Sequence, residues 1–345
     1  MQDQNMQNLR QTLESLDATL ASVLKKRLEV VAALNQGKLE DSYEKGVENL
    51  LNQVVQSCNE LQAAYQKPLE RVLKIACFGV PGSFTHQAMD EYFEGKSFVP
   101  SYFNQFEEIT EAVSRGEVDY GIVPIENSST GGITEVYDLL REHDCTIVGE
   151  RRIKIEQNLL AHPQAKLEDI RRVYSHPQGL RQSKAFFKDY PLMEQIPYFS
   201  TSKSAEMVAQ SKDVTMAAVA GKKAAELYGL KVLAANINFS NHNFTRFVVI
   251  SKNTEHIADA NKITVVLTVK HEPGSLYKTL GYFYHGGLNL MNLESRPMVD
   301  KSWEYFFHID LMGNLGDPCV KDALEEVEKN CTYLKILGNY RAHEK

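Results

Sequence analysis

Four short clusters of small polar residues and glycines stand where a ligand could be bound. They occupy residues 79–86 (GVPGSFTH), 126–132 (ENSSTGG), 176–179 (HPQG) and 200–204 (STSKS), at junctions between β-rich apolar runs and helical stretches. In open α/β sheets, ligands bind outside the carboxyl ends of the strands, where backbone N–H groups of helix N-termini hold an anion without Lys or Arg. We therefore expect the four clusters to converge on a small carboxylate.

A further candidate is the segment 243–247 (NFTRF), which places Thr245 and Arg246 at the start of a strand. The same pattern also fits an edge-strand threonine beside a salt-bridged arginine. His86 and His176 each lie at a junction, where a histidine more often caps a helix than acts as a base. No Gly-rich run fits a nucleotide-binding fingerprint, so the sequence does not support nucleotide binding.

The composition argues against several classes of protein. The 38 Lys and Arg against 45 Asp and Glu give a formal net charge of −7, whereas a nucleic-acid or anionic-membrane partner needs a basic face. No apolar run reaches the roughly 18–20 residues of a membrane helix, and the polar start of the chain lacks a signal-peptide core. The five cysteines are scattered without a CxxC pair, which predicts reduced thiols, a cytoplasmic location and no metal site.

Hydrophobic periodicity divides the chain into three segments, which we predict to be domains at residues 1–70, 73–252 and 261–340. In the first, apolar residues recur four and three positions apart, which is typical of a helical hairpin. The second alternates short β-rich runs with helical stretches, which predicts α/β layers. The third has the β-α-β-β-α order of a small ferredoxin-like domain.

The middle segment closely resembles the prephenate dehydratase family. The resemblance rests on GSFTHQA (82–88), VPIENSSTGG (123–132), SHPQGLRQS (175–183), TSKSAEMVA (201–209), MAAVAGKKAAELYGL (216–230) and NFTRF (243–247). It implies two α/β lobes of the periplasmic-binding-protein type with the site in the cleft between them. It also implies a lyase without cofactor or metal that converts prephenate to phenylpyruvate in L-phenylalanine biosynthesis.

The same resemblance implies roles for individual residues. Thr245 matches the catalytic threonine of the family, which would stabilise the departing hydroxyl oxygen while a neighbour or water supplies the proton. Arg246 could pair with a substrate carboxylate or be structural. The expected substrate-binding residues are Asn127, Ser128, Ser129, Ser175, Gln178, Thr201, Ser202, Arg246 and Phe247.

The third segment resembles the ACT domain that follows in the same family, through GSLY (274–277) and ESRP (294–297). The resemblance implies feedback regulation by L-phenylalanine bound between two protomers of a homodimer or homotetramer, with no nucleic-acid or membrane partner. A plain dimerisation domain is the alternative. The expected effector-binding residues are Gly274, Ser275, Leu276, Asn289, Leu290, Glu294, Ser295, Arg296 and Pro297.

The first 38 residues resemble the chorismate mutase that precedes the dehydratase in bifunctional proteins, with cations for chorismate at Arg10, Arg27 and Lys38. Beyond residue 38 the match fails, because the Arg-Glu pair that the family places in its second helix falls on Gly46 and Val47. We favour a decayed mutase kept as a dimerising hairpin over a shortened active one. Arogenate as the true substrate and a non-catalytic ligand sensor remain as further alternatives.

Overall fold

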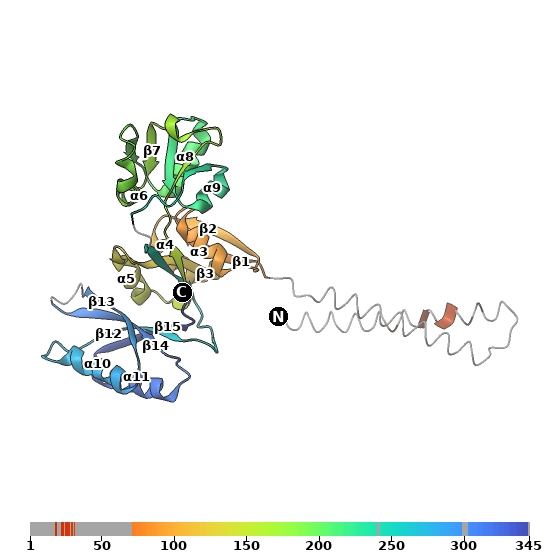
Figure 1. Ribbon diagram of the computed structural model, residues 1–345. Helices are drawn as coiled ribbons and strands as arrows, with labels where there is room; N and C mark the ends of the chain where they lie inside the picture. The colour runs from red at the N-terminus through yellow and green to blue at the C-terminus, as the bar shows by residue number, and fades with distance from the viewer. Residues whose placement is uncertain are drawn as a thin grey trace. The chain divides into compact units, whose positions relative to one another are not determined.

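The structure, a computed structural model, describes residues 71–345 except 240–241, 299–302 and 344–345, together with eight positions between residues 18 and 31. The contacts within the chain divide it into two compact units, Met1–Arg71 and Val72–Lys345. The second unit contains the strands and helices labelled from β1 to β15 in Figure 1. The expected helical hairpin lies outside the described residues, as do Arg10 and Lys38. Arg27 is described as an exposed residue of an α-helix.

The first lobe of the second unit is a mixed sheet with the strand order β2-β1-β3-β11-β5, in which the short β4 also pairs with β3. β1 runs parallel to β2 and β3, whereas β11 is antiparallel to both of its neighbours. The elements of this lobe are β1 (Leu73–Phe78), α3 (Phe84–Tyr92), β2 (Phe98–Phe103), α4 (Phe106–Arg115), β3 (Tyr120–Asn127), β4 (Gly131–Gly132), α5 (Thr134–Glu142), β5 (Thr146–Lys154) and β11 (Phe244–Ser251).

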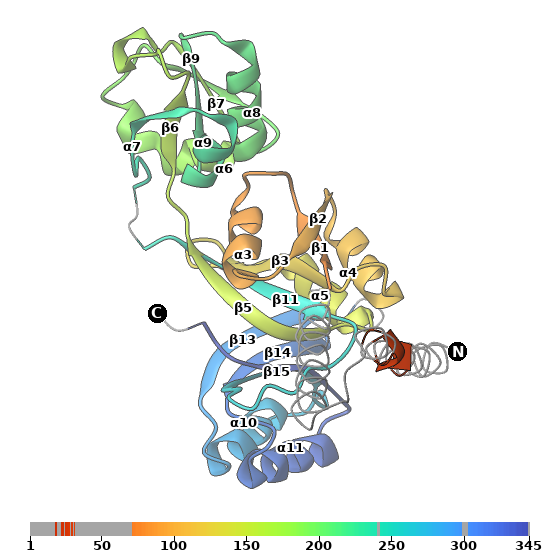
Figure 2. The ribbon, with the colours of Figure 1, turned by 90° about the vertical axis from the view of Figure 1, so that its right-hand side faces the viewer.

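The second lobe is a five-stranded sheet with the order β10-β6-β9-β7-β8. The chain enters this lobe after β5 and returns to the first lobe at β11, so two crossings join the lobes (Figure 2). The mixed α/β architecture in two lobes agrees with the expectation from the sequence. The elements are β6 (Asn158–Ala161), a 3₁₀ turn (Leu167–Asp169), β7 (Arg172–Ser175), α6 (Pro177–Gln182), α7 (Lys184–Phe187), β8 (Glu194–Pro197), α8 (Thr201–Ser211), β9 (Met216–Ala220), α9 (Lys222–Tyr228) and β10 (Lys231–Ala234).

Residues 262–340 form a third module, a four-stranded antiparallel sheet with the order β13-β14-β12-β15. The β-α-β-β-α order expected from the sequence is present and is completed by a final strand, which gives the ferredoxin-like arrangement. The elements are β12 (Lys262–Thr268), α10 (Ser275–His285), β13 (Leu290–Pro297), β14 (Tyr305–Met312), α11 (Pro318–Asn330) and β15 (Tyr333–Tyr340).

The third module and the first lobe share one hydrophobic core. Val266 and Leu337 of the module are buried in the same cluster as Ile147 and Val248 of the lobe. The backbones approach so closely that a Cβ at position 338, which is glycine, would overlap the Ile147 carbonyl. The module is therefore packed onto the lobe as part of one folded body.

A lysine of the third module caps the C-terminal end of helix α5 in the first lobe. The Lys335 Nζ of β15 donates to the carbonyls of Leu140, Arg141 and His143 at distances of 3.2, 3.0 and 2.8 Å. These carbonyls lie at the C-terminal end of α5, where no intrahelical donor remains and a cation is favoured. Within the described part of the chain, no helix is long and apolar enough to cross a membrane.

Candidate functional site

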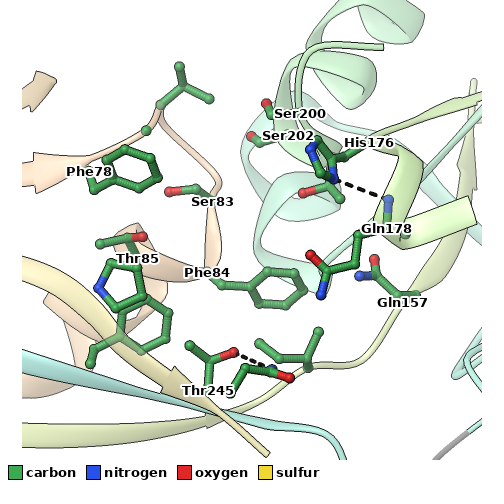
Figure 3. A pocket seen from close by; sticks show the side chains of 18 of the residues that line it. Phe78, Ser83, Phe84, Thr85, Gln157, His176, Gln178, Ser200, Ser202 and Thr245 are labelled. Atoms are coloured by element: carbon green, nitrogen blue, oxygen red, sulfur yellow. Dashed lines mark hydrogen bonds between the residues drawn. The ribbon is translucent and has the colours of Figure 1, made fainter. Parts of the chain in front are cut away.

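A cavity of about 290 Å³ lies between the two lobes and brings the four polar clusters together. Figure 3 shows Ser83 and Thr85 of the first lobe facing His176, Gln178 and Ser202 of the second across the cavity. Asn127, from the second cluster, lines it as well. The convergence expected from the sequence is therefore present, because parallel strands deliver their carboxyl ends to one edge of each sheet.

The wall of this cavity is suited to an anion. Helices α3 and α8 both begin at it, with Ser83 and Ser200 as N-caps whose hydroxyls accept from the backbone N–H groups of His86 and Lys203. The remaining N–H groups of each first turn have no partner within the helix and carry the positive end of its dipole. No Lys or Arg is among the described residues that line the cavity. Backbone groups are thus the source of positive potential here.

Thr245, on β11, lies at the floor of the cavity and is held by Asn127 at the end of β3. The Asn127 Nδ2 donates to the Thr245 Oγ1 at 2.8 Å and to the Asn243 Oδ1 at 2.9 Å. The Asn127 Oδ1 accepts from the Ser129 backbone N–H at 2.9 Å, which is an Asx turn. That N–H can only donate, so it fixes which end of the Asn127 amide faces Thr245.

The direction of this hydrogen bond decides what Thr245 can do. A hydroxyl has one hydrogen and two lone pairs. Because Asn127 donates to the Thr245 oxygen, the hydroxyl hydrogen is left to point into the cavity. Asn127 has both of its N–H bonds committed to Asn243 and Thr245, so its part is to orient Thr245 as a donor.

Six polar residues of the cavity were not among the site residues expected from the sequence: Ser83, Thr85, Gln157, His176, Gln182 and Ser200. His176 accepts from the Gln178 backbone N–H through its Nδ1 at 3.2 Å, and burial together with Arg181 lowers its pKa, which favours the neutral ring. Gln157 and Gln182 stand at the crossing between the lobes, and the buried Gln157 Oε1 has no hydrogen bond among the described residues. His176 had a signal in its junction position and Gln182 lies in the SHPQGLRQS motif, whereas Gln157 lies in no polar cluster or motif.

The structure brings together only part of the expected substrate-binding set. Ser128 lines a different cavity, and Ser129 donates its hydroxyl to Asn243 at 2.9 Å. Ser175 is fully buried and donates to the Val219 carbonyl at 2.7 Å, so its hydroxyl is not offered to a ligand. The residues that do line the cavity are Asn127, Gln178, Thr201, Ser202, Thr245 and Phe247. Their contact with substrate stays a prediction.

Arg246 points away from the cavity, which corrects the expectation that it lines the cleft. Its guanidinium, 4% exposed, pairs with Glu126 at 2.7 Å, with Asp310 at 2.8 Å and with Glu150 at 3.3 Å. Lys262 completes the cluster with Glu150 at 2.8 Å. Because Asp310 and Lys262 belong to the third module, the strand that carries Thr245 is tied to that module by buried ion pairs. The structural alternative for Arg246 is the one that the structure supports.

The two lobes also touch beside the cavity. The Pro81 carbonyl of the first lobe accepts from the Tyr228 hydroxyl at 2.9 Å and from the Ser202 hydroxyl of the second lobe. Gly82 adopts a φ of +79°, and a Cβ there would lie 2.8 Å from the Ser202 Oγ. Only glycine suits both the left-handed backbone and this approach. The cleft is therefore closed on this side by contacts between the lobes.

The residues expected to bind an effector do not form one pocket within the chain. Gly274, Ser275 and Leu276 line a cavity at the start of α10. On β13, Arg296 faces the first lobe and pairs with Asp138 at 2.9 Å. Glu294 faces it too, since its carboxylate would lie 3.3 Å from a Cβ at Gly132. Ser295 and Pro297 are exposed on the other face, and Asn289 and Leu290 precede them at the start of the strand.

Within the described residues, no three His, Cys, Asp or Glu side chains come together as metal ligands would. The cavity groups named above can donate hydrogen bonds and bind an anion.

The comparisons with known proteins agree with this site. The family model described as prephenate dehydratase matches residues 75–255. The bifunctional chorismate mutase/prephenate dehydratase of Aquifex aeolicus (strain VF5) is 38% identical over 273 residues, 79% of this chain and 74% of that protein. The solved prephenate dehydratase of Arthrobacter aurescens in complex with L-Phe is 30% identical with a TM-score of 0.70, over 78% of this chain and 90% of that one. A solved chain described as GqqA, a novel type of quorum quenching acylases, is 30% identical with a TM-score of 0.71, over 78% and 98%.

The matched region contains every residue that lines the cavity, from Phe78 to Phe247. Because the family model covers more than half of the sequence and the relatives are similar over most of the rest, the chain belongs to the prephenate dehydratase family.

Proposed function

We propose that this protein is a prephenate dehydratase, a carbon–oxygen lyase that converts prephenate to phenylpyruvate in L-phenylalanine biosynthesis. The observation that carries the proposal is the Thr245 hydroxyl, which Asn127 orients as a donor in a cavity walled by helix N-termini. Prephenate has two carboxylates and one ring hydroxyl. It therefore needs anion-binding N–H groups and one donor aimed at the hydroxyl, which is what the cavity offers.

The reaction breaks two bonds and forms an aromatic ring. The C–C bond to the ring carboxylate breaks, CO₂ leaves, and the electron pair enters the ring. The C–O bond of the ring hydroxyl breaks, and the oxygen leaves as water after taking up one proton. Thr245 donates a hydrogen bond to this oxygen as charge develops on it, while the proton comes from a neighbour or water because an alcohol is a poor acid. Aromatisation drives the reaction, so the cavity mainly positions the substrate.

The test is turnover of prephenate by the purified protein and by two variants of Thr245. We expect phenylpyruvate from the unmodified protein, a rate lower by about 10²–10³ in Thr245→Ala, and partial retention in Thr245→Ser, which keeps the hydroxyl. No turnover in any of the three would instead support a ligand sensor. A parallel assay with arogenate, which carries an ammonium group in place of the keto group of prephenate, measures phenylalanine formation. It shows which of the two compounds is the substrate.

The fold alone does not identify this reaction, because a solved chain with a similar fold is described as an acylase. What favours the lyase is the site. The described cavity holds three glutamines and the Thr245 hydroxyl that Asn127 orients as a donor, and the match to the family model spans the whole of it.

A bifunctional enzyme with chorismate as first substrate is the second candidate. It is favoured by the Aquifex aeolicus relative, which is named as both enzymes. The loss of the Arg-Glu pair at Gly46 and Val47 is the argument against it. Phenylpyruvate formed from prephenate but not from chorismate would identify a decayed mutase segment, whereas formation from both would show an active one.

We further propose that residues 261–340 are an ACT domain through which L-phenylalanine inhibits the enzyme, in a cytoplasmic homodimer or homotetramer. The ferredoxin-like topology supports the domain, and the Arthrobacter aurescens structure was solved with L-Phe. Tyr277 and Tyr284 of α10 are 80% and 78% exposed, an apolar surface of the kind that a second copy covers. Molar mass by light scattering, with and without L-phenylalanine, tests assembly, and inhibition of prephenate turnover tests regulation.

A further inference from the structure

A second cavity, of about 550 Å³, lies on the opposite face of β11 from Thr245. Along this strand Thr245 and Phe247 line the first cavity, whereas Phe244 and Arg246 line the second. This is the ordinary alternation of a strand, whose successive side chains point to opposite faces of the sheet. The dehydratase reaction uses nothing on this side.

Three charged residues lie side by side across the floor of the second cavity. In the register of the sheet, Arg246 of β11 pairs with Glu126 of β3 on one side and with Arg152 of β5 on the other. Neighbouring strands are about 4.8 Å apart, so the outer two backbones are about 10 Å apart. The row thus places an anion and a cation at its two ends, with Arg246 between them.

The central residue, Arg246, is fully engaged in ion pairs, whereas the two outer side chains keep hydrogen-bonding atoms without a partner among the described residues. Arg246 is 4% exposed and already pairs with three carboxylates. Arg152 is 28% exposed, and its only ion pair in the described part of the chain is an approach of its Nε to the Glu150 Oε1 at 4.0 Å. The Glu150 Oε2 accepts from Lys262 at 2.8 Å and from Arg246 at 3.3 Å, and its Oε1 accepts from the His343 backbone N–H at 3.1 Å, so the 4.0 Å approach of Arg152 is longer than a hydrogen bond. The Arg152 guanidinium therefore keeps donors for a ligand.

Glu126 offers the complementary group. Its Oε2 accepts both hydrogen bonds from Arg246, at 3.0 and 2.7 Å, while its Oε1 has no hydrogen bond among the described residues. The Glu126 side chain is 37% exposed and lines the cavity. An aromatic surface completes the wall, because the Phe244 ring is 39% exposed beside it.

We infer that this second cavity is an amino-acid site, which binds a zwitterionic α-amino acid with an aromatic side chain. Its carboxylate lies on Arg152, its ammonium on Glu126 and its ring against Phe244. A zwitterion adds no net charge beside the buried ion pairs of Arg246. A dicarboxylate would instead place a negative group against Glu126, and a diamine would place a positive group against Arg152, and both contacts are repulsive. The site is separate from the dehydratase cavity and from the effector residues expected on the third module.

The test is calorimetric titration of the full-length protein with L-phenylalanine, 3-phenylpropionate and 2-phenylethylamine. The last two lack the ammonium and the carboxylate, respectively. Arg152→Met removes the carboxylate partner and Glu126→Gln weakens the ammonium partner. Lys154→Met is the matched control, because it also removes a cation from β5 but concerns a residue that pairs with Glu156 at 2.7 Å and does not line the cavity.

We expect Arg152→Met to weaken one L-phenylalanine site by at least tenfold, the scale of a lost charge-assisted hydrogen bond, and Lys154→Met to leave it unchanged. If a second site exists on the third module, the stoichiometry per chain falls by one and the remaining site is kept. Equal binding by the unmodified protein and Arg152→Met, or binding of 3-phenylpropionate as tight as that of L-phenylalanine, would overturn the inference.

Thermal unfolding of each variant separates loss of the site from loss of the fold. The comparison of the three ligands on the unmodified protein decides the question even if a variant does not fold. Prephenate turnover measured on the same samples is independent of this inference, so failure of the proposed dehydratase function would be seen separately.

Discussion

Asn127→Asp is the substitution that tests most directly whether the direction of one hydrogen bond controls the reaction. The aspartate has the same shape, but its ionised carboxylate can only accept. In the native protein the Asn127 Nδ2 donates to the Thr245 Oγ1 at 2.8 Å. After the substitution the Thr245 hydroxyl must donate to the carboxylate, and its hydrogen is turned away from the substrate.

The size of the effect follows from this contact. A hydrogen bond to a charged group contributes about 1.5–3 kcal/mol, and it must break before Thr245 can donate to the departing oxygen. If Thr245 stays turned, the loss is that of a donor to developing charge, about 2.7–4 kcal/mol. We therefore expect kcat to fall by about 10²–10³. Acidification should restore part of it, because a protonated carboxyl can again donate to Thr245.

The assay is phenylpyruvate formation from prephenate across a pH series, by the native protein, Asn127→Asp, Thr245→Ala and the double variant. The introduced charge also repels an anionic substrate, and the double-mutant cycle separates the two effects. Repulsion persists when Thr245 is absent, whereas control of its hydroxyl does not. We expect Asn127→Asp to cost less than tenfold in the Thr245→Ala background. An equal cost in both backgrounds would refute the argument that Asn127 acts by orienting Thr245.

Three further substitutions probe other parts of the structure. Arg246→Leu leaves Glu126, Glu150 and Asp310 with Lys262 as the remaining cation of the cluster. We therefore expect the free energy of unfolding, measured in urea, to fall by about 3–5 kcal/mol. Unchanged stability together with a raised KM for prephenate would show instead that Arg246 binds the substrate. Tyr228→Phe removes the hydrogen bond to the Pro81 carbonyl between the lobes, and we expect KM for prephenate to rise by about 2–10-fold at similar kcat; an unchanged KM would mean that this contact does not favour closure. His308 is buried, its ring nitrogens have no hydrogen bond in the described part of the chain, and burial lowers its pKa to about 4. The unfolded chain then binds more protons between about pH 6.5 and pH 4, so stability falls by about 3 kcal/mol as the pH drops through that range; His308→Phe should flatten this dependence in urea titrations at pH 7 and pH 4.5, and an equally steep dependence in the variant would assign it to other groups.

Much of the architecture could be predicted from the sequence because its signals are local. Short apolar strands, polar junctions and helical stretches give the α/β layers, and the same junctions give the cleft. The motifs also include Thr245 and Asn127, which the structure places side by side in one cavity. What could not be predicted is the bonding of the Asn127 amide, because Asn243 and Ser129 approach it only in the folded chain.

The errors in the expected site have a simple geometric origin. Thr245 and Arg246 are consecutive residues of one strand, so they must point to opposite faces, and a cleft that holds the first cannot hold the second. The same alternation applies to ESRP, where Arg296 turns to the first lobe while Ser295 and Pro297 turn outward. Treating a motif as a set of ligands ignores this period of two. Gln157 was missed for another reason, since a lone glutamine at a crossing between lobes has no local signature.

The core shared by the first lobe and the third module limits which C-terminal modules could replace this one. A C-terminal module that replaced this one would need a lysine where Lys335 reaches α5 and a glycine where Gly338 meets Ile147. A foreign module without both would leave carbonyls uncapped and force two backbones apart. Chimaeras joined between residues 252 and 261 should therefore fold only when both contacts are grafted with the module, although the junction itself lies between two separate strands.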